Sequence, residues 1–88
     1  MSDNDKLLTF PTYFPVKVFG PNEPSYIVAI RDIVFHHFPE TKEGDIRLKP
    51  SDNENYVSIT LNLYVMNQKE LDAVYRALHG HADTKMVL

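Results

Sequence analysis

The 88-residue chain contains no cysteine and only three glycines, which stand apart from one another. The missing cysteines exclude disulfides, thiolate catalysis and thiolate metal sites. Three isolated glycines do not form the glycine-rich loop that cradles a phosphate group. No apolar run approaches the ~18 residues that a membrane-spanning helix needs.

Charge and apolar content are those of an ordinary small globular protein. The formal net charge is −3, which provides no general attraction to nucleic acids or membranes. With 43% hydrophobic and 24% charged residues, the chain is expected to form one domain around a thin core. Residues 1–9 are predicted to be a flexible tail and residues 10–88 the domain. The polar start, Met1–Lys6, does not resemble a signal peptide, so we expect a cytoplasmic protein.

The most regular segment, Tyr56–Val65, alternates between apolar and more polar residues without a break. Successive side chains of a strand point to opposite sides, so the segment predicts a long strand with one buried face. The positions predicted to be buried are Val57, Ile59, Leu61, Leu63 and Val65. The other side carries no acid, histidine or cysteine, so this strand specifies a fold and not an active site.

Further elements follow from apolar spacing and from boundary residues. We expect strands over residues 13–19, 45–49 and 84–88, and helices over residues 24–38 and 67–79. Gly20 and Pro21 are expected to close the first strand, in which Pro15 must lie where no ladder N–H is needed. In the second strand, Ile46 and Leu48 are predicted to point inward.

Both predicted helices have recognisable faces and ends. The first carries an apolar stripe of Ile27, Ile30, Val34 and Phe38. Asn67 and Glu70 resemble a capping box at the start of the second helix, and Gly80 suits the position after its end. The resulting order is βαββαβ, and two right-handed crossovers place both helices on one face of the sheet. We therefore predict an α+β, ferredoxin-like domain with a four-stranded antiparallel sheet, the first and third strands being central.

Three separated motifs resemble the YbeD-like bacterial family, a domain of unknown function. They are Phe10–Gly20, the hairpin segments Lys49–Ser51 and Tyr56–Thr60, and the ending Lys85–Leu88. The resemblance covers residues 7–88 and implies a ferredoxin-like fold similar to small-molecule-sensing ACT domains. It implies no established activity; regulatory roles, including one linked to lipoate metabolism, have been suggested for the family.

Two positions depart from the family pattern. Asn53-Glu54-Asn55 replaces a hairpin turn that often contains glycine, and an asparagine is expected to adopt the left-handed conformation there. Thr84 stands where an apolar residue is usual, so the last strand is expected to pack less firmly.

No catalytic, metal or cofactor site is predicted. The acids Glu40, Glu43, Asp45, Asp52 and Glu54 fall in polar loops, where we expect them to be solvated. Carboxylates that act as a catalytic acid and base need burial or mutual proximity, which these positions do not suggest. His36 and His37 diverge by about 100° on a helix, so they do not readily share one ion. His79 and His81 are better spaced but lack a cysteine or a matched carboxylate. His37 and His79 lie near predicted helix C-termini, where an imidazole interacts favourably with the helix dipole.

The helix-free face of the sheet is the main candidate for binding. The predicted outward positions include four cations, namely Lys17, Arg47, Lys49 and Lys85. They would gather with Tyr13, Phe19, Ser58, Thr60 and Asn62. Such a face suits an anion or an acidic partner. The alternative is that outward strand positions are charged because water lies there and because edge charges discourage aggregation.

RNA recognition by the same topology places stacking aromatics in the middle of the central strands. Here those positions hold Ser58, Thr60 and Asn62, and the RNP pattern is absent, so nucleic-acid binding is disfavoured. Val28 and Phe35 lie on one line of the first helix, away from its core stripe. They are either a contact with another protein or isolated surface apolar residues.

The sequence therefore favours a non-enzymatic regulatory or protein-interaction module, ACT-like, with an unknown protein partner or a second copy. The alternative is a small-molecule or nucleic-acid sensor that binds through the basic open face.

Overall fold

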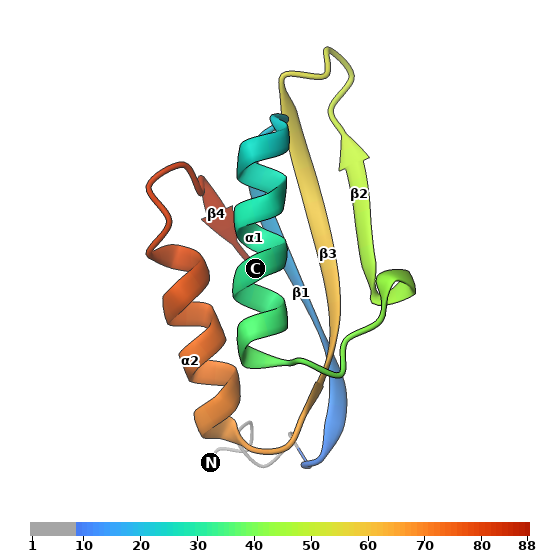
Figure 1. Ribbon diagram of the computed structural model, residues 1–88, viewed down its shortest axis with the longest axis vertical. Coiled ribbons are helices and arrows are strands. Elements are labelled where there is room, and N and C mark those ends of the chain that lie inside the picture. Colours follow the sequence, from blue (N-terminus) through green and yellow to red (C-terminus); the bar gives the residue numbers. More distant parts are fainter. Residues whose placement is uncertain (1–8) are drawn as a thin grey trace, which may run out of the picture.

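The computed structural model describes residues 9–88, so the expected tail falls outside these residues except for Thr9. Its elements are β1 (Thr12–Pro21), α1 (Pro24–His37), the short 3-10 helix η2 (Glu43–Asp45), β2 (Ile46–Pro50), β3 (Tyr56–Val65), α2 (Gln68–His79) and β4 (Met86–Val87). The strands form one antiparallel sheet in the order β2-β3-β1-β4, and both helices lie in front of it in Figure 1. The predicted ferredoxin-like fold, with β1 and β3 central, is confirmed.

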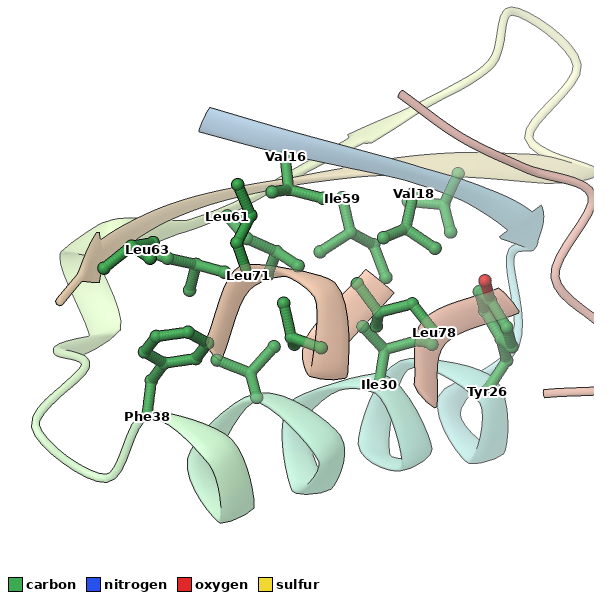
Figure 2. Packing of buried hydrophobic residues seen from close by; sticks show 14 residues of the cluster. Val16, Val18, Tyr26, Ile30, Phe38, Ile59, Leu61, Leu63, Leu71 and Leu78 are labelled. Atoms are coloured by element: carbon green, nitrogen blue, oxygen red, sulfur yellow. The ribbon is translucent and has the colours of Figure 1, made fainter. Parts of the chain in front are cut away.

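The core lies between the helices and the inward side of the two long strands. Its strand residues are Val16, Val18, Val57, Ile59, Leu61, Leu63 and Val65, and its helix residues are Tyr26, Ile30, Val34, Leu71, Val74 and Leu78. Phe38, directly after the end of α1, completes the cluster. Figure 2 shows Tyr26 and Phe38 at opposite ends of this cluster. Within residues 9–88, every buried side chain belongs to a hydrophobic residue, so the core is held mainly by apolar packing.

The first strand extends further than expected, because Gly20 and Pro21 belong to β1 instead of ending it. Gly20 faces α1, and a Cβ added there would lie 2.3 Å from the ring of Tyr26. Tyr26 is therefore a core residue, while Ile27, which was predicted to lie on the buried stripe, is only half-buried. The ring of Tyr26 takes the space that a side chain at position 20 would need.

The position of Pro15 follows from the ladder between β1 and β4. Lys17 donates its N–H to the carbonyl of Leu88 and accepts the N–H of Leu88 in return. Alternate residues of a strand direct their backbone groups to the same side, so the nitrogen of Pro15 also points toward the β4 side. β4 does not reach that far, so Pro15 removes no ladder bond, as expected.

Leu48 is a correction to the predicted core. Its partner in the alternation, Ile46, is half-buried, but Leu48 is 49% exposed. The reason is that β2 is an edge strand, set apart from the helices in Figure 1. The regular part of the last strand is also shorter than predicted, although the N–H of Lys85 bonds to the carbonyl of Phe19.

The helix and turn boundaries differ in detail from the predicted ones. Asn67 accepts the N–H of Glu70 at 2.9 Å, but the Glu70 carboxylate accepts from Met66, one residue before the cap. The backbone of Gly80 has the right-handed helical conformation, with φ −72°. In the β2–β3 turn, Glu54 and not an asparagine takes the left-handed conformation, with φ 60°.

Among residues 9–88, no helix is both long enough and apolar enough to cross a membrane.

Candidate binding face

The open face of the sheet, on the side away from the helices, is formed by cross-strand rows of side chains. The register places Lys17 opposite Thr60 and Thr60 opposite Arg47. The next row contains Lys49, Ser58, Phe19 and Met86. Three cations from two different strands therefore lie within two adjacent rows, as the alternation predicts.

Within the strands, the charge of this open face is of one sign, although Asp52 of the β2–β3 turn lines the hollow beside Lys49. The outward positions within β1, β2 and β3 include Lys17, Arg47 and Lys49 but no acid. None of the three cations forms an ion pair with another residue of 9–88, and all three are exposed. The chain as a whole is acidic, so its carboxylates lie on other surfaces and leave this face basic.

Aromatic rings stand at both ends of the open face. Tyr13 and Tyr64 are cross-strand partners whose ring centroids are 4.9 Å apart. At the other end, Phe19 and Tyr56 line a shallow hollow of about 250 Å³ together with Lys49. The middle holds Ser58, Thr60 and Asn62, as the sequence predicts. The open face therefore offers a cationic, hydrogen-bonding centre between two apolar ends.

Lys85 does not take the place predicted for it. Met86 is opposite Phe19, so the register gives the outward position of β4 to Met86, which is 51% exposed. Lys85 instead lines a hollow with Pro21 and Tyr56 at the end of the sheet. Sequence alternation alone does not tell which residue of a two-residue strand faces outward. Only the pairing with β1 decides this.

The histidines are spread over separate places. His36 and His37 form an edge-to-face pair in the last turn of α1, and His79 is exposed in the last turn of α2. His81 accepts the N–H of Asp83 through Nδ1 and lies edge-on to Tyr26. Among residues 9–88, no group of three or more histidines or acids could hold a metal ion.

A contact that sequence reasoning missed joins Tyr26 to Thr84. The Tyr26 hydroxyl and Thr84 Oγ1 are 2.9 Å apart, in a hydrogen bond between residues 58 positions apart. Burial raises the pKa of the Tyr26 phenol, and the hydrogen bond with Thr84 offsets part of that rise. Thr84 therefore supplies the polar partner that a buried tyrosine needs, which accounts for its departure from the family pattern.

The two residues of the predicted helix patch differ in exposure. Val28 is 54% exposed, but Phe35 is half-buried, with the guanidinium of Arg31 5.5 Å from its ring centroid. Arg31 is held in turn by Glu43, which accepts two hydrogen bonds from it. The Arg31 partner lowers the pKa of the Glu43 carboxyl. Phe35 is thus covered by a cation from its own helix rather than left bare.

Comparison with known sequences gives matches over nearly the whole chain. A family model described as "Protein of unknown function (DUF493)" matches residues 5–88. A UPF0250 protein of Neisseria meningitidis serogroup C is 42% identical over 82 residues, covering 93% of this chain and 90% of that protein. A UPF0250 protein of Janthinobacterium sp. (strain Marseille) is 36% identical over 88 residues, covering 100% and 97%.

Two solved structures have a similar fold. One is the ACT domain from GTP pyrophosphokinase of Chlorobium tepidum, with a TM-score of 0.63 and 18% identity, covering 88% of this chain and 97% of that one. The other is the C-terminal domain of the MgtC protein from Mycobacterium tuberculosis, with a TM-score of 0.68 and 14% identity, covering 93% and 89%. At these identities the likeness shows the fold alone.

Proposed function

The chain belongs to the YbeD-like family described as a protein of unknown function (DUF493), as its motifs indicate, and we propose that it is a non-enzymatic regulatory module. It acts by binding an acidic partner protein through the open sheet face. The observation that carries the proposal is the row Arg47–Thr60–Lys17 together with Lys49, on a face without acids within β1, β2 and β3. The ACT-like fold supports a regulatory role by analogy.

The open face has the composition of an interaction surface. Apolar groups at its two ends, Tyr13 with Tyr64 and Tyr56 with Met86, are each about half exposed. Tyrosine and methionine are enriched in interfaces because they bury large apolar areas while tolerating water. Cations between them add electrostatic steering and orientation, which an acidic partner would satisfy.

The open face is better suited to an acidic partner than to a second copy of itself. Two copies docked face to face would bring Lys17, Arg47 and Lys49 of each chain against those of the other. Placing like charges against one another in an interface makes the free energy of association less favourable by several kcal/mol. A carboxylate-rich surface would instead pair with these cations.

A charge reversal tests the proposal. Lys17→Glu with Lys49→Glu should abolish capture of the native partner from host lysate and leave the circular dichroism spectrum unchanged. The matched control is Lys69→Glu with Arg76→Glu, which changes the net charge equally on α2. Capture that survives in the first variant, or is lost equally in the control, would refute the role of the open face.

The second candidate function, a sensor of small anions or nucleic acid, uses the same cations and the hollow beside Phe19 and Lys49. Titration with a single-stranded oligonucleotide at increasing salt separates the two. Phosphate-dominated binding weakens steeply with ionic strength, whereas a contact with a large apolar part does not. The absence of rings at Ser58, Thr60 and Asn62 favours the protein partner.

We propose that self-association uses a different surface on α1, where Val28 is exposed and the Arg31 guanidinium over Phe35 would form part of the contact. Phe35→Glu should then lower the self-association measured by sedimentation without unfolding the domain. An unfolded variant would show Phe35 to be internal packing, and an unchanged one would leave it an ordinary surface residue. The proposed location of the protein remains the cytoplasm.

A further inference from the structure

The lower end of β3 has a strand on one side only. β1 pairs with β3 from Tyr56 to Val65, but β2 pairs with it only from Val57 to Leu61. Figure 1 shows β3 continuing well past the start of β2. The stretch Asn62–Val65 is therefore an edge within an otherwise central strand.

The ladder pattern tells which backbone groups face that edge. Lys17 exchanges both of its backbone hydrogen bonds with Leu88, so its groups point toward β4 and away from Thr60. Thr60 must then direct its own N–H and C=O toward β2, and Tyr64, four residues on, has the same orientation. No residue of 9–88 donates to or accepts from the backbone of Tyr64 on that side. Its N–H and C=O are thus available to an added strand.

A hollow of about 360 Å³ lies directly beside this edge. Its apolar walls are Tyr13, Tyr64, Phe38 and Met66, and the loop after α1 closes it with Pro39, Thr41 and Lys42. An unpaired strand edge beside an apolar hollow is the arrangement by which sheets recognise extended peptides. Main-chain bonds supply the attachment, and a pocket for alternate side chains supplies the selectivity.

The rim of the hollow is acidic. Glu40, Asp45 and Glu70 line it, against one cation, Lys42, and His37. Asp45 and Glu70 each accept a backbone N–H of the chain itself, from Lys42 and Met66, which keeps their charges at the rim. A basic segment complements this rim, whereas a second copy would bring an identical acidic rim against it.

We propose that the Tyr64 edge and its hollow bind an extended basic segment of a partner protein as an added strand. One apolar side chain of the segment enters the hollow, and a flanking Lys or Arg meets Glu40. This site is separate from the cations of the open face and does not depend on the function proposed for them.

The test uses a phage library of random dodecapeptides, panned against the full chain. The expected products alternate apolar and polar residues and carry lysine or arginine. When a selected peptide is added to ¹⁵N-labelled protein, the Tyr64 amide should gain protection from hydrogen exchange. N-methylation of every second residue of the peptide should weaken binding at least tenfold when the methylated nitrogens are those that face β3. Methylation of the intervening residues, whose nitrogens face away, should have little effect.

Variants of the protein provide the controls. Glu40→Lys should lower the affinity for the selected peptide by about threefold or more. Glu23→Lys, at the start of α1 and outside this hollow, should leave that affinity unchanged. Lys17→Glu with Lys49→Glu should leave peptide binding unchanged, which separates this site from the cations of the open face, although Tyr13 and Tyr64 belong to both surfaces. The proposal is overturned if panning enriches no peptide, or if the amides that the peptide protects from hydrogen exchange lie elsewhere in the protein. It is also overturned if Tyr64 is protected by protein concentration alone, which would mean pairing with a second copy.

Discussion

The two faces of the sheet differ sharply although the same strands supply both. On the helix side, Val18, Ile59 and Leu61 have no exposed surface. On the other side, their chain neighbours Lys17 and Thr60 contact solvent. One face is therefore fixed by packing, and the other is free to carry whatever binding the protein performs.

The comparison explains where change is tolerated. A close-packed interior responds to the loss of even one methylene group, because neighbouring side chains relax only partly. Outward positions away from special features usually change stability by no more than about 0.5 kcal/mol. Binding and stability should therefore separate cleanly in variants of this protein, with the largest losses of stability on the helix side of the sheet.

The largest expected effect comes from the middle of β3. Leu61→Ala should lower the free energy of unfolding by about 2–5 kcal/mol, because it leaves a cavity under the helices. Its neighbour on the open face, Thr60→Ala, should cost about 0.5 kcal/mol or less. Urea midpoints of the two variants measure the difference. The reverse order would mean that the two faces have been assigned the wrong way round.

Gly20→Ala tests whether the helix face also tolerates no added volume. The new Cβ would meet the ring of Tyr26 at 2.3 Å, so the ring or the start of α1 must move. Overpacking of this kind costs about 1–3 kcal/mol. Gly44→Ala, where a Cβ would meet nothing within 4 Å, is the matched control. Equal thermal midpoints for the two variants would contradict the close contact.

Tyr26 gives the helix face a dependence on alkaline pH. Burial raises the pKa of its phenol above the ordinary value of about 10, so the folded state holds the proton more tightly than the unfolded chain. The resulting stability is fully present below about pH 10 and is lost as the pH rises through the folded pKa. Burial also raises the pKa of Tyr75, so the wild type has two such groups.

Tyr26→Phe removes one of these two groups. It should cost about 0.5–1.5 kcal/mol at neutral pH, because Thr84 loses its partner. The difference from wild type should then shrink as the pH rises above about 10, through the raised pKa of the folded state. Denaturant titrations at several pH values measure it, and a difference that grows with pH would contradict the assigned sign.

The smallest predicted effect lies in the β2–β3 turn, which belongs to neither face. Glu54→Gly should stabilise the protein by about 0.5–1 kcal/mol, since a left-handed φ of 60° strains glutamate and not glycine. Binding through the open face should be unaffected. Destabilisation would show that the Glu54 backbone is held there without strain.

Sequence alternation predicted the inward residues of β3, and the βαββαβ order with right-handed crossovers predicted the sheet and its central strands; the structure confirms all of these. Alternation was misleading at Leu48, because it tells which side a residue faces but not whether a helix covers that side. It was also misleading at Lys85, because a short strand has no pattern of its own and takes its phase from β1.

The sequence by itself determined the order of the elements and the polarity of each face, because helix and strand periods are local properties of the chain. The tertiary structure decided three other features. They are the buried contact of Tyr26 with Gly20 and Thr84, the outward position of Met86, and the unpaired edge at Tyr64. Each depends on which distant segments meet and on how far they extend along one another, and a local pattern carries no information about the length or register of its partner segment.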